Sequence, residues 1–213
     1  LAQPKTSTMS LHLAASVTIG NHVLPSILAA FMRQYPRSQV HSKRGNTAQV
    51  LASLRGFDID IGFIEGPAGD ADLVCLPWLT DTLQVFAAPT HRLAGKTVGK
   101  RELARAAWVS REPGSGTRSQ WEHALHSLGL APRIVLELEQ PEALRRCVAQ
   151  GLGLGCLSRL EVDEALMQGT LAPVCTPDLA LERRLHIVLR RDAYRPAAVL
   201  ALLRHAQVAE EVV

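Results

Sequence analysis

The chain has 213 residues, of which 47% are hydrophobic and 20% charged, and its formal net charge is +3. This composition is typical of a soluble globular protein, and no apolar run reaches the ~18 residues that a membrane-spanning helix needs. Lysines and arginines are scattered along the chain, which argues against a nucleic-acid-binding surface on this segment itself. We therefore expect a small partner molecule and no contact with a membrane.

The chain opens without a methionine or a secretory leader, and residues 1–9 are polar and lack periodicity. This start predicts the remnant of a linker to something N-terminal. The four cysteines lie at wide spacings within apolar stretches, at Cys75, Cys147, Cys156 and Cys175. Since no Cys-x-x-Cys pair occurs, we expect buried reduced thiols and a cytoplasmic protein.

The first part of the chain alternates strand and helix patterns. Strands are predicted at residues 11–15, 39–43 and 59–64, and helices at 21–34 and from Thr47 to Gly56, with a polar loop at 16–21. The third strand is almost continuously apolar, as expected for a strand buried on both faces of a parallel sheet. This β-α-β-α-β order with short connections indicates a doubly wound α/β layer.

The second part repeats the pattern. Strands are predicted at 83–88, 107–110 and 134–138, a buried run at 153–157, and helices at 119–128 and from Pro141; a strand at 184–189 and a helix at 196–207 follow. We expect two Rossmann-like lobes joined by two crossover segments. Lobe I would comprise residues 10–82 and 182–213, and lobe II residues 83–181.

The densest cluster of polar groups is Glu112-Pro-Gly-Ser-Gly-Thr-Arg118, between a predicted strand and a predicted helix. Glycines expose backbone N–H groups, two hydroxyls add donors, and the start of the helix carries partial positive charge, so the segment could bind an anion. The alternative is a helix N-cap loop with Arg118 on the surface. Its position after a strand favours contact with a ligand.

Other polar residues also follow predicted strands, and ligands of open α/β sheets bind at the carboxyl ends of the strands. Capping of the next helix is the alternative role for Ser16 and Thr18, and the favoured one for Asn46 and Thr47. The candidate ligand-binding residues are Ser16, Thr18, Asn46, Thr47, Glu65, Ser115, Gly116, Thr117, Arg118 and Gln140.

Catalytic and cofactor motifs fail on spacing. The glycines at 151, 153 and 155 precede an apolar strand, whereas a dinucleotide fingerprint follows one, so a tight turn with close packing is favoured. The segment around Ser115 lacks both the Gly-x-Ser-x-Gly elbow and the Walker lysine. His123 and His126 lack a third metal ligand. We therefore expect no catalytic residue, no metal and no cofactor.

An ordered set of motifs resembles the effector-binding domain of LysR-type transcriptional regulators. They are Leu13-Ala14-Ala15-Ser16-x-Thr18-Ile19-Gly20, Phe31-x-x-x-Tyr35-Pro36, Gly45-Asn46-Thr47, Leu54-x-x-Gly-Phe-Asp58-Ile-Asp60-Ile-Gly62, His91-Arg92-Leu93-Ala94, Glu112 to Arg118, Val148-Ala-Gln-Gly151-Leu-Gly153 and Leu157-Ser158. The likeness covers residues 10–205, and the 112–118 segment is similar to the branch associated with sulfur and cysteine metabolism.

The resemblance implies a fold like that of type 2 periplasmic binding proteins, with a small-molecule effector in the cleft between the lobes. It also implies homodimers or homotetramers that bind promoter DNA through an N-terminal winged helix-turn-helix absent from this chain. A small anion is the effector class that the branch suggests, and Glu112 would repel it unless Arg111 or Arg118 neutralises the carboxylate. The alternative from another class is the solute-binding protein of a transporter, which shares the architecture.

Overall fold

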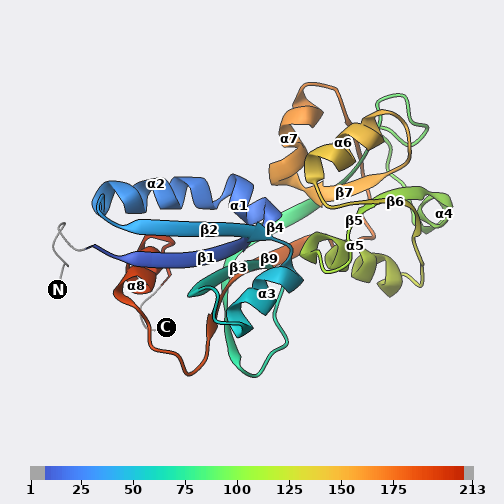
Figure 1. The fold of residues 1–213 in the computed structure, drawn as a ribbon. Coiled ribbons are helices and arrows are strands. Elements are labelled where there is room, and N and C mark those ends of the chain that lie inside the picture. The colour runs from blue at the N-terminus through green and yellow to red at the C-terminus, as the bar shows by residue number, and fades with distance from the viewer. Residues whose placement is uncertain (1–7, 209–213) are drawn as a thin grey trace. The chain divides into compact units, whose positions relative to one another are not determined.

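The computed structural model of the chain describes residues 8–208 (Figure 1). The fold divides into two compact units, unit 1 with Leu1–Leu79 and Arg184–Val213, and unit 2 with Thr80–Arg183. The chain passes from one unit to the other within strand β4 (Leu73–Ala87) and returns within strand β9 (Glu182–Arg190). The predicted linker at residues 1–9 lies outside the described residues except for its last two, of which Met9 is buried in the core.

Unit 1 is built on a sheet with the strand order β2-β1-β3-β9, followed by the first part of β4. Strand β1 (Ser10–Ser16) lies between β2 (Gln39–Gly45) and β3 (Ile61–Glu65) and is parallel to both, whereas β9 is antiparallel to β3. Every residue of β3 is buried, which confirms the prediction from its apolar run. Because the first three strands are parallel, their carboxyl ends lie at the same edge of the sheet.

Helices cover both faces of this sheet. Helices α1 (Val17–His22), α2 (Leu24–Gln34) and α8 (Ala197–His205) pack on one face, in a core that includes Phe31, Phe63 and Leu202. Helix α3 (Thr47–Arg55) covers the other face with Val50 and Leu54. Because helices cover both faces of the sheet, β3 is buried throughout and has one polar side chain, that of Glu65.

The segment predicted as a loop at residues 16–21 is instead helix α1, so that prediction was wrong. The polar residues of this segment gave no helical pattern. Helix α1 ends at His22 with Val23 as its C-cap, and α2 begins at Leu24 with Pro25 in its first turn. A proline has no backbone N–H to continue the hydrogen-bonding of a preceding turn, and it is well accommodated in the first turn of a new helix.

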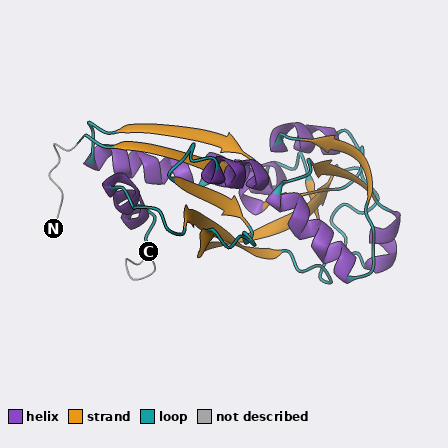
Figure 2. Ribbon diagram, turned by 60° about the horizontal axis from the view of Figure 1, so that its bottom comes forward, coloured by secondary structure: helices purple, strands orange, loops and turns teal. Residues whose placement is uncertain are grey.

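Unit 2 has β5 (Ala107–Arg111) parallel to β6 (Arg133–Leu138), while β7 (Gly155–Ser158) and β8 (Ala172–Val174) are antiparallel to β4. A parallel bridge between Trp108 and Leu154 lies just before β7. Helices α4 (Lys100–Arg105) and α5 (Gly116–Ser127) contribute to one core of the unit, and α6 (Pro141–Ala149) and α7 (Arg159–Met167) to another. Figure 2 distinguishes these helices from the strands that they flank.

Several elements of unit 2 differ from the sequence predictions. Strand β4 begins at Leu73, ten residues before the predicted start at Leu83. The prediction missed the first part of the strand because Pro77 and Asp81 interrupt its apolar pattern. Helices α4 and α7 and strand β8 were not predicted; α4 is only 6 residues long and β8 only 3. Short elements carry too little periodicity to be recognised in a sequence.

The glycine-rich turn before β7 is a packing feature, as predicted. Gly153 has φ 149°, and a Cβ at this position would lie 2.4 Å from the carbonyl oxygen of Ala107. Only glycine leaves room for the two backbones to approach so closely. The turn therefore fixes the start of β7 against β5 and holds no dinucleotide fingerprint.

The cysteines are free thiols, but the prediction that all four are buried was wrong. Cys156 is buried, Cys75 and Cys147 are half-buried, and Cys175 is exposed. Apolar neighbours in the sequence did not reveal that Cys175 follows the short strand β8 at the surface. Within residues 8–208, no helix has the length and apolarity required to span a membrane.

Candidate functional site

Polar residues end all three parallel strands of unit 1. Ser16 ends β1, Asn46 directly follows β2, and Glu65 ends β3. In the register of the sheet, Ser16 is opposite Gly45, the residue before Asn46. The structure therefore brings Ser16, Asn46 and Glu65 to one edge, which is the edge where ligands bind in open α/β sheets.

Ser16 is the most informative of these residues. Its side chain is 1% exposed, and its Oγ has no hydrogen-bond partner among the described residues. Although Ser16 is the N-cap residue of α1, its side chain makes no capping hydrogen bond. The capping alternative is therefore wrong for this hydroxyl. A buried polar group without a partner is costly, which makes it a candidate for a group completed by a ligand.

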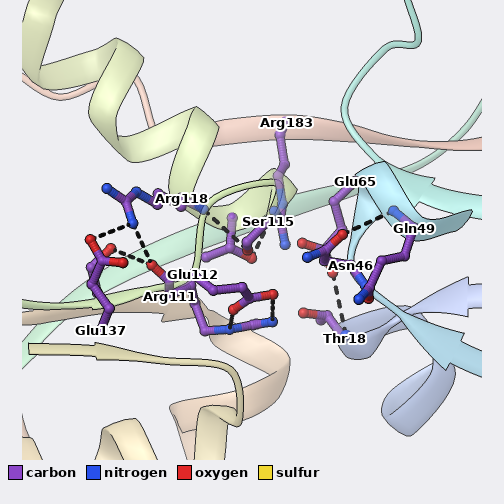
Figure 3. Close-up of polar contacts among 12 residues, drawn as sticks. Thr18, Asn46, Gln49, Glu65, Arg111, Glu112, Ser115, Arg118, Glu137 and Arg183 are labelled. Atoms are coloured by element: carbon purple, nitrogen blue, oxygen red, sulfur yellow. Dashed lines mark hydrogen bonds and ion pairs between the residues drawn. The ribbon is translucent and has the colours of Figure 1, made fainter. Parts of the chain in front are cut away.

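Thr18 and Glu65 are joined directly. The backbone N–H of Thr18 donates to Oε1 of Glu65 at 3.3 Å, and both residues are buried (Figure 3). The hydroxyl of Thr47 donates to the backbone carbonyl of Glu65 at 3.5 Å. Glu65 is thus a buried carboxylate held at the edge of the sheet by two neighbouring segments.

Asn46 caps helix α3, as its favoured interpretation predicted. Its side chain accepts from the backbone N–H of Gln49 at 3.0 Å, and the Gln49 side chain accepts from the backbone N–H of Asn46 at 2.8 Å (Figure 3). This reciprocal pair is a capping box, in which each side chain satisfies a backbone donor at the helix start. Asn46 therefore fixes the entry of α3 beside Glu65.

In unit 2 the polar loop after β5 leads directly into α5. The helix begins at Gly116 and not at Ser119 as predicted, and Gly114 has φ 88° in the turn before it. Ser115 is the N-cap: its side chain accepts from the backbone N–H of Arg118 at 3.4 Å, and its exposure is only 2%. The capping prediction for this loop is confirmed, since the Ser115 side chain satisfies one of the backbone donors at the start of the helix.

Arg118 is held by carboxylates. Its Nε donates to Glu122 at 2.8 Å, its Nη1 lies 3.0 Å from Glu137, and Nη1 also donates to the carbonyl of Arg111 at 3.1 Å (Figure 3). Burial lowers the pKa of Arg118, but hydrogen bonds to Glu122 and Glu137 outweigh it and raise the pKa above its ordinary value. The guanidinium ties α5 to β5 and β6 and the side chain is 14% exposed, so Arg118 joins these elements and does not lie freely on the surface as the alternative interpretation predicted.

Arg111 neutralises Glu112. Its Nε and Nη2 donate to the two carboxylate oxygens of Glu112 at 2.9 and 3.1 Å, and the Arg111 side chain is 2% exposed (Figure 3). This two-point geometry is the strongest form of an arginine–carboxylate pair. The expectation that Glu112 would repel an anion depended on its being unneutralised, and the pairing with Arg111 removes most of that repulsion.

Thr117 contacts a buried network that the sequence analysis missed. Nη1 of Arg183 donates to Oγ1 of Thr117 at 3.1 Å, and its Nε donates to Oδ2 of Asp81 at 2.8 Å. The hydroxyl of Ser158 donates to Oδ1 of Asp81 at 2.7 Å. The sequence signal was limited to a charged residue, Asp81, within the predominantly apolar strand β4, and it does not reveal the pairing with Arg183 on β9.

Cys156 lies close enough to this network to be affected by it. Burial raises the pKa of the Cys156 thiol far above its ordinary value, with a further rise from the charge of Asp81 and an opposing effect from Arg183. A thiol of this kind stays protonated and unreactive at neutral pH. Cys156 is therefore a core residue and not a nucleophile.

Gln140 and the two histidines of α5 lie at the surface. Gln140 is exposed at the N-cap of α6, where its side chain makes no capping hydrogen bond. His123 and His126 are exposed, and residues 8–208 contain no group of three or more potential metal ligands. A cavity of about 550 Å³ in unit 2 is lined by residues 173–177 and 179–182 among others, and by none of the predicted site residues.

These features define a two-unit α/β ligand-binding domain of the periplasmic-binding-protein-like class. The model of the LysR substrate binding domain matches residues 5–209, and the chain belongs to this family of transcriptional regulators.

Two relatives and one solved structure illustrate the membership. The uncharacterized HTH-type transcriptional regulator YeiE of Escherichia coli K12 is 38% identical over 200 residues, covering 94% of this chain and 68% of the relative. The HTH-type transcriptional regulator CysL of Bacillus subtilis is 34% identical over 179 residues, which cover 84% of this chain and 60% of CysL. The regulatory domain of Synechocystis PCC6803 CcmR, solved in complex with 2-PG, superposes with a TM-score of 0.85 at 26% identity, covering 93% of this chain and 96% of that one.

Proposed function

We propose that this effector-binding domain senses a small anion that also carries a hydrogen-bond donor. The observation that carries the proposal is the buried Ser16 hydroxyl, which has no partner among the described residues. The effector would supply the missing partner. This assignment explains why a polar side chain is kept at a position where alanine would fit.

The charges of the candidate site favour this effector class. In unit 2, the loop 112–118 combines a helix start with hydroxyls, and Arg111 offsets the charge of Glu112. These groups suit an anionic moiety. In unit 1, Glu65 is a buried carboxylate and accepts hydrogen bonds, which suits a hydroxyl or ammonium group of the same effector. That one effector contacts Ser16, Thr18, Asn46, Thr47, Glu65, Ser115, Gly116, Thr117, Arg118 and Gln140 together stays a prediction.

Ser16→Ala tests the proposal. Small anions, including sulfate and 2-PG, are screened by thermal shift on the wild type, because a ligand at 100 times its Kd adds ~2.7 kcal/mol of stability. The Kd of each stabilising anion is then measured by calorimetry. We expect Ser16→Ala to weaken binding about tenfold, equivalent to ~1.4 kcal/mol, the size of one hydrogen bond.

Ser42→Ala is the matched control, since Ser42 is exposed on β2 and belongs to no candidate site. It should bind each anion as the wild type does. Unchanged affinity in Ser16→Ala would remove Ser16 from the site. A screen in which only uncharged or cationic compounds stabilise the wild type would overturn the anionic class.

The chain spans 68% and 60% of the length of the two regulators compared above. We propose that the remaining part is an N-terminal winged helix-turn-helix that binds promoter DNA in the cytoplasm, with the effector shifting the affinity of the protein for DNA. A coupling free energy of ~1 to 3 kcal/mol is enough for useful regulation. Band shifts with the full-length protein, with and without the effector, test this; identical DNA affinities would contradict it.

We further propose that the protein acts as a homodimer or homotetramer, and that it senses its effector without turning it over. Multi-angle light scattering across a wide concentration range tests the first statement, and a monomer at every concentration would contradict it. Mass spectrometry of the ligand recovered after long incubation tests the second, since chemical conversion would indicate an enzyme.

A further inference from the structure

Arg183 is a buried arginine outside the set of predicted site residues, yet it contacts one of them. Its side chain is 1% exposed and forms an ion pair with Asp81, whose side chain is 3% exposed, with Nη2 2.7 Å from Oδ2. The Nε of Arg183 lies 2.8 Å from the same carboxylate oxygen. Nε and Nη2 of the guanidinium thus contact Asp81, and Nη1 donates to Thr117 in the first turn of α5.

The network continues beyond the ion pair. Ser158, the N-cap of α7, donates to Asp81 and accepts from the backbone N–H of Leu160 at 3.1 Å. Thr117, Arg183, Asp81 and Ser158 therefore connect the starts of helices α5 and α7 through strands β9 and β4. All four residues are at least nine-tenths buried. In such surroundings, hydrogen bonds are strong and alternative arrangements are costly.

The position of the ion pair in the chain gives the network its significance. Asp81 is the second residue of unit 2 and Arg183 is its last. Each lies on a strand through which the chain passes between the units, close to the point of passage. The Arg183 side chain, which contacts α5, thus belongs to one connecting strand and is bonded through Asp81 to the other.

We propose that Arg183 is a positioning residue that orients the first turn of α5 for effector binding and links that turn to the two connecting strands. The proposal rests on the proposed function, because it assigns Thr117 to the effector site. Arginine suits the role because its rigid fork satisfies Asp81 and Thr117 with different nitrogens, whereas the single nitrogen of lysine serves both partners less well.

The test removes the ion pair without leaving a buried charge. Breaking one partner of a buried pair is strongly destabilising, whereas replacing both by apolar residues of similar volume is often tolerated. The double variant Asp81→Leu/Arg183→Met should therefore fold. Ser158→Ala is the matched control, because it removes a hydrogen bond to Asp81 on the side away from Thr117.

Hydrogen exchange gives a readout that needs no ligand. In the wild type the amides of Arg118 and Ser119 are bonded to Ser115 in the first turn of α5. We expect these amides to exchange about tenfold faster in the double variant and at the wild-type rate in Ser158→Ala. Arg183→Lys should also show the faster exchange. Unchanged exchange in the double variant would overturn the positioning role, whatever the protein binds.

A double-mutant cycle with 2-PG as the probe connects the network to binding. If Arg183 acts through Thr117, then Thr117→Val, the double variant and the combined triple variant should each weaken 2-PG binding by a similar factor of about ten. A triple variant weakened by about the product of the two factors would overturn the link. Unchanged affinity in Thr117→Val alone would instead show that Thr117 does not contact the effector, which contradicts the part of the proposed function that assigns Thr117 to the site.

Discussion

The backbone N–H of Thr18 donates to the side chain of Glu65, a residue 47 positions later in the chain, at 3.3 Å. The bond joins the first helix of unit 1 to the end of the third strand and leaves a carboxylate buried at the polar edge of the sheet. A buried negative charge is an unusual component of a site for an anion. The effect of the Glu65 carboxylate on the affinity for an effector therefore indicates which charges and donor groups the effector carries.

Glu65→Gln should therefore strengthen the binding of an anion that has no hydrogen-bond donor, such as sulfate. Glutamine retains an oxygen that accepts from Thr18, but the variant loses a negative charge, and two like unit charges ~4 Å apart repel each other by ~1 kcal/mol even when they are screened as in bulk water. Calorimetry with sulfate should show affinity rising about fivefold, a change equivalent to that free energy. Glu164→Gln, remote in sequence on α7 of unit 2, serves as control. Weaker sulfate binding in Glu65→Gln would contradict the expected repulsion, whereas an effector that donates a hydrogen bond to Glu65, as proposed above, should bind this variant less tightly than the wild type.

Thr117→Val should lower the free energy of unfolding as well as effector affinity. The valine cannot accept from Nη1 of Arg183, and the loss of a hydrogen bond to a charged group costs ~1.5 to 3 kcal/mol. Thr117→Ser keeps the hydroxyl and should recover most of the loss. Urea unfolding measures both variants; equal stability of Thr117→Val and the wild type would show that the contact with Arg183 contributes little.

Gly153→Ala should destabilise the protein much more than Gly151→Ala. Both glycines have positive φ, 149° and 89°, but a Cβ at 153 would overlap the carbonyl of Ala107, whereas a Cβ at 151 meets nothing within 4 Å. We expect a loss of ~2 to 5 kcal/mol for the first and ~1 to 2 kcal/mol for the second. Chemical unfolding of the two variants side by side provides the comparison, and similar losses would mean that the contact with Ala107 relaxes easily.

His186 should make the protein less stable as the pH falls below neutral. Burial lowers the pKa of its imidazole in the folded state. A hydrogen bond to the Arg184 backbone opposes this effect and the charge of Arg184 adds to it, so on balance the folded protein disfavours the protonated form. The stability is fully present above the unfolded-state pKa of ~6.5 and is lost as the pH falls below that value. His91, whose pKa is also lowered by burial, should add to the slope.

His186→Gln should flatten the dependence of the unfolding free energy on pH between pH ~7 and ~5. His123→Gln, on the exposed face of α5, is the control variant. Urea unfolding at a series of pH values gives both slopes. A slope that is the same in His186→Gln and the wild type would assign the acid sensitivity to other groups.

The periodicity of the sequence predicted most of the fold because the third strand is almost continuously apolar and the longer helices have clear apolar faces. The strand 11–15 and the helix that begins at Thr47 are examples that the structure confirms. Strand β4 was recognised only in its second part, since Pro77 and Asp81 disrupt the pattern of its first part. A local sequence pattern shows which residues share a buried face of one helix or strand. It does not show which residues of different elements pack together.

The candidate site was less predictable for the same reason. Residues that follow strands, such as Ser16 and Glu65, could be placed at the edge of a sheet from the order of the elements alone. The partner of Thr117 could not, because Arg183 is 66 residues away in the chain and its other partner, Asp81, is 102 residues before it. Pairings over such separations depend on the tertiary fold, and one sequence contains no local record of them.

The stacked indoles of Trp108 and Trp121 give the protein an internal optical probe. Their ring centroids lie 4.8 Å apart with an angle of 17° between the planes, and both side chains are buried. Trp121 is on α5, one turn after Thr117, while Trp108 is fixed on β5. Any shift of α5 would change the overlap of the two rings, so fluorescence and near-ultraviolet circular dichroism would follow the motion of this helix without an added label.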